Sequence, residues 1–126
     1  MSITTEKALK AHLALQNLLK ADTDNKFVFK TATRFKLAQN LRKVTPIQED
    51  VEKERNGLIV RLGSLDEKGN TIVTQENVPA FQQGIQELLS VKVEVEFIPV
   101  KVDDLGENQI PVDILAALIE FGIVTE

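Results

Sequence analysis

The chain has 126 residues, a length typical of one domain, and its 43% hydrophobic and 27% charged residues argue against wholesale disorder. No apolar run approaches the roughly 18 residues that span a bilayer, and the N-terminus lacks a basic-then-apolar signal pattern. We therefore expect no membrane segment. The absence of cysteine excludes disulfides, thiolate metal sites and cysteine nucleophiles. Tryptophan and tyrosine are absent too, so few side chains suited to catalysis remain.

The two halves of the chain carry opposite charge. Residues 1–63 hold 12 Lys and Arg against 7 Asp and Glu, a net of +5, and residues 64–126 hold 3 against 12, a net of −9. Such a division is typical of nucleic-acid or partner contact. It also arises when the basic half folds onto the acidic half of the same chain, or when copies attract one another head to tail.

The first third of the chain is predicted to be helix, loop and extended segment. Leu and Ala recur at helical spacing over residues 5–20, and Thr4 or Thr5 is placed to cap this amphipathic helix. Residues 21–25 are rich in Asp, Asn and Thr and are expected to form a loop. Residues 26–30 are expected to be a short strand or extended segment, with their two phenylalanines on one side.

The longest element is predicted between Thr31 and Leu62. A seam with spacings alternating between four and three runs along it, as at the a and d positions of a coiled coil. Gln48 and Arg55 interrupt this seam, and the other members are assigned to a protein interface or to the core: Leu37, Leu41, Val44, Val51, Leu58 and Leu62. Pro46 either kinks one helix or divides it into two consecutive helices, and we favour one kinked helix.

The acidic half is predicted to combine short strands with two helices. Residues 66–70 have the composition of a turn, and Val91 to Phe97 alternate apolar with charged residues, as in a half-buried strand. A helix is expected to start near Pro79, with Asn77 as its cap and a buried face of Phe81, Ile85, Leu88 and Leu89. Pro111 opens the last helix, and its inward residues are expected to be Ile114, Leu115, Leu118, Ile119 and Phe121.

These elements define an α+β fold in a single domain, residues 1–126. The helical, basic half is residues 1–63, and it contains the long kinked helix. The acidic half, residues 64–126, contributes a small antiparallel sheet flanked by helices.

A catalytic, cofactor or metal site is not predicted. His12 is the single imidazole and has no second histidine or cysteine to complete a zinc site, so it is interpreted as a surface or half-buried helix residue. Asp103, Asp104 and Glu107 do not match the spacing of a calcium loop and are interpreted as a solvated acidic loop. Nucleotide-binding and hydrolase motifs are also absent from the sequence.

One basic stretch supports a nucleic-acid alternative. Phe27, Phe29 and Phe35 interleave its cations, and aromatic rings among cations stack bases beside phosphate contacts. Phe27 and Phe29 also alternate as core residues do, so we favour a solvated helix face or a protein contact for this stretch. The candidate nucleic-acid contacts are Lys26, Lys30, Arg34, Lys36, Arg42 and Lys43.

The order of these segments resembles a family of small tailed-bacteriophage and prophage proteins of unknown function. In that family a basic helix rich in Leu, Ala, Lys and Asn leads into a glutamate-rich stretch, here 34–43 and then 52–58. An acidic turn with glycine, a Val/Glu alternating segment and a proline-opened helix follow, here 66–69, 91–97 and 110–119. The resemblance implies phage origin and carries over no functional residue.

Together these features predict a non-enzymatic phage or prophage protein that binds another protein. The virion-component, assembly-factor and host-adaptor roles stay open, and the partner is a second copy or a host or phage protein. The alternative is a nucleic-acid-binding accessory protein that uses the basic stretch. We expect the protein in the host cytoplasm or in the virion.

Overall fold

The structure is a computed structural model that describes residues 2–23, 27–106 and 108–125, without the side chains of residues 22 and 23. The α+β class with a helical N-terminal half is confirmed. Lys26, Glu107 and residues 24–25 of the predicted loop lie outside the described residues, whereas residues 21–23 of that loop are wrong as a prediction, because α1 continues through them. The elements in chain order are β1 (Ser2–Thr4), α1 (Thr5–Thr23), α2 (Thr31–Leu62), β2 (Gly63–Leu65), β3 (Thr71–Val73), η1 (Gln75–Asn77), α3 (Val78–Ser90), β4 (Lys92–Glu94), β5 (Val100–Lys101), η2 (Val102–Leu105), α4 (Val112–Glu120) and β6 (Val124–Thr125).

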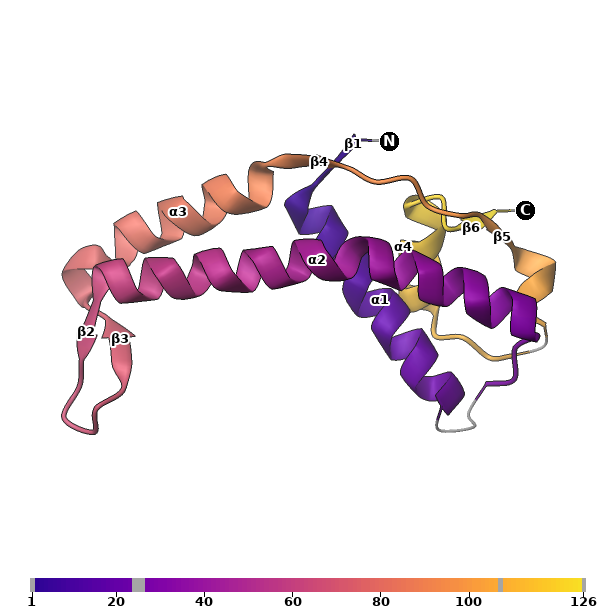
Figure 1. The fold of residues 1–126 in the computed structure, drawn as a ribbon, viewed down its shortest axis with the longest axis horizontal. Helices are drawn as coiled ribbons and strands as arrows, with labels where there is room; N and C mark the ends of the chain where they lie inside the picture. The colour runs from indigo at the N-terminus through magenta and orange to yellow at the C-terminus, as the bar shows by residue number, and fades with distance from the viewer. Residues whose placement is uncertain (1, 24–26, 107, 126) are drawn as a thin grey trace.

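Helix α2 runs along the whole long axis of the molecule (Figure 1). Its 32 residues correspond to about 48 Å of helix. α1, α4 and the strands β1, β4, β5 and β6 surround its N-terminal half, and we call this part, residues 2–51 and 91–125, the body. The C-terminal half of α2 continues past the body beside α3 and ends in the β2–β3 hairpin (Figure 1). We call this part, residues 52–90, the arm.

Pro46 is accommodated inside α2 without dividing it. A proline at this position has no N–H for the carbonyl four residues earlier. Thr45 adds a local hydrogen bond in which its Oγ1 donates to the Leu41 carbonyl at 2.8 Å, a contact that favours bending of helices. Figure 1 shows α2 changing direction near its middle, which is where Pro46 lies in the sequence. The alternative of two separate helices is therefore wrong.

The body holds the hydrophobic core. α1 lays a stripe of small and branched side chains on α2, and Ala8, Ala11, Leu15 and Leu18 are fully buried. Thr4 caps α1, because its Oγ1 accepts a hydrogen bond from the Lys7 amide at 3.3 Å. Residues from the segment 95–105 and from the C-terminal segment 118–124 complete this core: Val95, Val100, Leu105, Leu118, Phe121, Ile123 and Val124.

The described strands form three separate two-stranded pairs. β1 pairs with β4 and β2 with β3, both antiparallel, whereas β5 pairs with β6 in parallel. The strand predicted over Val91 to Phe97 is shorter, because only Lys92–Glu94 pair with β1. The strands β1 and β6 were not predicted from the sequence. Each is only two or three residues long, so neither has the alternating pattern that identifies a strand.

Two details of the C-terminal half differ from prediction. Asn77 makes no side-chain hydrogen bond to α3, and its Nδ2 instead donates to the Leu62 carbonyl at 2.8 Å, which satisfies the end of α2. Ile119, which the spacing predicts to point inward, is exposed. It lies on the outer side of α4, whereas its neighbour Leu118 lies on the inner side and is buried. Gly122, with φ of 72°, ends the helix as expected.

Candidate protein-interaction surface

The seam predicted along α2 divides at the border between body and arm. Leu37, Val44 and Val51 are buried, and Leu41 packs half-buried against the core beside α1. Leu58 and Leu62 lie in the arm and are only half-buried. The N-terminal part of the seam is therefore packed into the core of the same chain. Its C-terminal part, in the arm, is only partly covered by other residues.

The arm contains no buried side chain over residues 52–90, all of which the structure describes. It is nevertheless rich in apolar residues. Val60 and Leu65 expose 72% and 71% of their surface, and Ile72 on the hairpin is also exposed. Two helices and a hairpin of two three-residue strands are too few layers to enclose a core. The arm thus leaves apolar surface that the chain does not cover.

Helix α3 carries an apolar face that the chain covers only in part. The sequence pattern predicts that Phe81, Ile85, Leu88 and Leu89 are buried, but no residue of α3 is buried. This prediction is wrong because, among the described helices, α2 alone lies beside α3 along most of its length, and α1 reaches only the C-terminal end of α3 (Figure 1). A single neighbouring helix covers one side of an apolar face that spans two adjacent rows of side chains.

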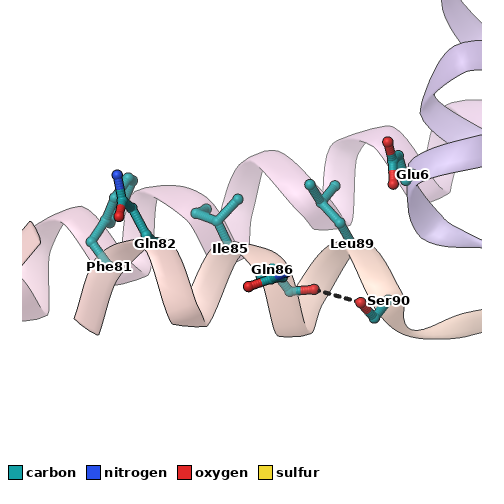
Figure 2. A pocket seen from close by; sticks show the side chains of 7 residues that line it. All are labelled: Glu6, Phe81, Gln82, Ile85, Gln86, Leu89 and Ser90. Carbon is teal, nitrogen blue, oxygen red and sulfur yellow. Dashed lines mark hydrogen bonds between the residues drawn. The ribbon is translucent and has the colours of Figure 1, made fainter. Parts of the chain in front are cut away.

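One row of α3 lines an open groove of about 440 Å³. Figure 2 shows Phe81, Ile85 and Leu89 following one another along the same side of α3. The polar lining comes from Gln82, Gln86 and Ser90, and Ser90 Oγ donates to the Gln86 carbonyl at 2.8 Å. Glu6, at the start of α1, stands at the end of this groove (Figure 2). We call these residues the α3 groove.

The other row of α3 packs against α2. Gly84 lies so close to Leu58 that a Cβ at position 84 would be 3.0 Å from Leu58 Cδ2. Leu58, Arg61 and Glu87 line the hollow on this flank. Glu87 is the only charged residue of α3, so the side chains that α3 contributes to the α3 groove carry no charge.

The basic stretch is distributed over the surface and the core of the body. Phe29 is buried, and its ring centroid lies 5.9 Å from that of half-buried Phe27, so neither ring is presented for base stacking. Phe35 is 57% exposed. The cations Lys30, Arg34, Arg42 and Lys43 are exposed and Lys36 is half-buried. Of the three aromatic rings predicted to stack bases, only Phe35 is thus exposed near these cations.

The acidic half lies along the basic half within the body. Lys43 Nζ donates to the Glu96 carbonyl, and Thr33 Oγ1 donates to the Asp104 carbonyl at 3.4 Å. The acidic segment 94–104 therefore runs beside the first turns of α2. Packing of the basic half on the acidic half of the same chain is thus present in the body, through contacts that include these two hydrogen bonds.

Asn40 holds the extended chain against α2. It is completely buried, and its Nδ2 donates to the Ile98 carbonyl at 2.8 Å while its Oδ1 accepts from the Ile98 amide at 2.7 Å. Asn108 makes the equivalent pair of hydrogen bonds to Val28, at 2.9 and 2.8 Å. These amides replace strand partners for an irregular segment. Both therefore serve the fold rather than a binding site.

The remaining candidates lie on α1 and η2. His12 is half-buried on α1, and burial lowers its pKa. Asp103 and Asp104 belong to η2, and the described part of the chain contains no group of acidic or histidine side chains placed to hold a metal ion. None of the helices in the described ranges is long and apolar enough to cross a membrane.

Comparisons with models of protein families, with curated proteins and with solved structures found no match to this chain. A function for this chain must therefore be proposed from the burial and charge of its own surface residues. The helical spacing located Phe81, Ile85 and Leu89 but assigned them to the core. A sequence signal that could have identified this surface is the composition of α3, which contains three glutamines and a single charge.

Proposed function

We propose that this chain is a non-enzymatic protein-binding module of a tailed phage or prophage, and that the arm is its binding element. The observation that carries the proposal is the arm's lack of any buried side chain, although it presents apolar rows on α2, α3 and the hairpin. Uncovered apolar surface bordered by polar residues is typical of protein interaction sites. The phage assignment is supported by the order of sequence segments alone.

The α3 groove is the proposed centre of contact. Its apolar row with amide neighbours matches the charge-depleted centre of protein interfaces. This placement replaces the interface predicted along α2, because Leu37, Val44 and Val51 are already used by the core. A nucleic-acid role receives less support, since Phe29 is buried and acidic residues run beside the basic turns.

Position-specific photo-crosslinking tests this function. A photoreactive phenylalanine analogue replaces Phe81 in the α3 groove or, as the matched control, exposed Phe35 in the body. The chain is then irradiated in a lysogenic or infected host cell. We expect one protein adduct from position 81, a second copy included, and none from position 35. The proposal fails if position 81 gives no protein adduct, and a nucleic-acid adduct at position 35 supports the alternative.

A further inference from the structure

We propose that the α3 groove is filled by a second copy of this chain, with the two α3 helices packed antiparallel across a two-fold axis. This inference rests on the proposed function, because it names the partner of the same surface. Twofold dimers are the commonest closed assemblies, and their contact brings one surface patch against its own copy.

The arm supplies two helices, which is half the number found in a four-helix bundle. Within the arm, α3 lies beside α2 as a helix pair, and none of their side chains there is buried. Two helices can bury only the strip between them, whereas four helices enclose a common core. A second copy supplies the missing pair of helices. The half-buried Phe81, Ile85 and Leu89 then become the centre of that core.

The face of α3 that lines the groove is also complementary to itself. In a twofold contact every charged group near the axis meets an equal charge, so a self-binding patch must be uncharged there. Among the residues that α3 contributes to the groove, none is charged, and Glu87 lies on the opposite flank beside Arg61. Gln82 and Gln86 each carry a donor and an acceptor, so identical amides can hydrogen-bond to one another.

The one charged side chain that lines the groove has an ion-pair partner on its own helix. Glu6 lies at its end on α1, and its Oε1 is 3.8 Å from Lys10 Nζ. A basic partner would find no free acidic cluster among these lining residues, and an acidic partner would find no basic one. The groove therefore fits an amphipathic helix that presents an uncharged face, and α3 itself presents such a face.

The geometry predicts which residues meet. Phe81, Ile85 and Leu89 follow at spacings of four, so they form one row along α3 with Ile85 at its centre. Antiparallel pairing of two identical rows places Ile85 opposite Ile85 of the second copy. It places Phe81 of each copy opposite Leu89 of the other. The register is thus a specific, measurable consequence of the twofold contact.

Sedimentation equilibrium of the full chain over a range of concentrations tests the dimer. We expect the wild type to reach twice the 14.0 kDa chain mass, and Ile85→Glu to remain at the single-chain mass. Ala80→Glu is the matched control, because Ala80 is exposed on α3 and does not line the groove. This control adds the same charge and is expected to dimerise like the wild type. Circular dichroism verifies that each variant keeps its helix content, and Ile85→Gln repeats the test without a charge.

Cysteine crosslinking tests the twofold register in a background that contains no cysteine. Ile85→Cys is expected to form a covalent dimer on mild oxidation, because the axis places the two side chains together. Ala80→Cys is expected to stay largely uncrosslinked. A dimer that survives Ile85→Glu, or one in which Ile85→Cys gives no covalent product, contradicts the inference.

The dimer and the binding role of the arm fail in distinguishable ways. A wild-type chain that is monomeric at every concentration overturns the dimer. If photo-crosslinking at position 81 still gives an adduct with a different protein, the arm remains a binding element with another partner. If it gives no protein adduct at all, the proposed function fails with it.

Discussion

At the residue scale, Asn40 shows how one buried polar side chain organises this molecule. A buried amide is stable only when its donor and acceptor are both satisfied, and Ile98 satisfies both at 2.8 and 2.7 Å. The bond joins α2 to a segment 58 residues later in the chain. These two hydrogen bonds thereby fix the position of the segment around Ile98 against helix α2.

Replacing Asn40 by alanine is expected to destabilise the fold strongly. Asn40→Ala removes both hydrogen bonds and leaves the Ile98 amide and carbonyl without their partner, so the free energy of unfolding should fall by about 2–4 kcal/mol. Asn56→Ala, an exposed position on the same helix, is the control and should change it by less than about 0.5 kcal/mol. Urea unfolding followed by circular dichroism measures both. Equal values for the two variants would contradict the structural role of Asn40.

His12 gives the protein a pH-dependent stability at the residue scale. Burial lowers its pKa in the folded chain, so the folded state binds the proton less readily than the unfolded chain, whose histidine pKa is about 6.5. The contribution of His12 to the free energy of unfolding is therefore fully present above about pH 6.5 and is lost as the pH drops through the lowered pKa. His12→Gln should lose less stability than the wild type between about pH 7.5 and about pH 5.5 in urea titrations. Identical losses in the two proteins would contradict a lowered pKa.

At the element scale, the two helical glycines of the arm have different surroundings. A Cβ at Gly57 would meet only Arg61 Nη1 at 3.5 Å, an ordinary contact, whereas a Cβ at Gly84 would come within 3.0 Å of Leu58. Gly57 therefore weakens α2 without a packing reason. Gly84 allows α3 to approach α2 closely.

Alanine at the two glycines should have different effects. Gly57→Ala is expected to raise the free energy of unfolding by about 0.5–1 kcal/mol, the usual gain in a helix interior. Gly84→Ala gains the same propensity but forces Leu58 to move, so its net change should be smaller or negative. Chemical unfolding of both variants provides the comparison. A larger gain at position 84 than at position 57 would show that the α2–α3 contact is loose.

The long helix shows how far periodic patterns predict an element. The spacing of apolar residues along 31–62 predicted α2 with both of its ends, and the same spacing predicted α1 and α4 closely. Long amphipathic helices repeat their signal many times, so their position is predictable. The strands β1, β5 and β6 have no such repetition. They exist because a distant segment supplies their hydrogen bonds.

At the scale of the whole molecule, a body with a buried core is joined to an arm without one (Figure 1). Local stability follows burial, because opening a segment that buries little apolar surface costs little free energy. One continuous helix, α2, belongs to both parts. The arm is therefore expected to be the less stable part of a single chain.

Hydrogen exchange measures this difference. At a concentration where the chain is monomeric, amides of α3 and of the distal half of α2 should exchange faster than those of α1 and the proximal half of α2. Raising the concentration should slow exchange in the arm while leaving the body unchanged, if a second copy covers the arm. Mass spectrometry of peptic fragments resolves the two parts. Equal protection of body and arm in the monomer would contradict the division.

The sequence by itself determined the helices and the turn around Asp66 to Gly69, because these depend on neighbouring residues. The tertiary structure alone decided which apolar residues are covered. Leu37 and Leu58 occupy the same seam, yet Leu37 is buried in the core of the body and Leu58 remains half-buried in the arm. Periodicity identifies the apolar face of a helix, but the neighbour that covers it comes from contacts distant in sequence.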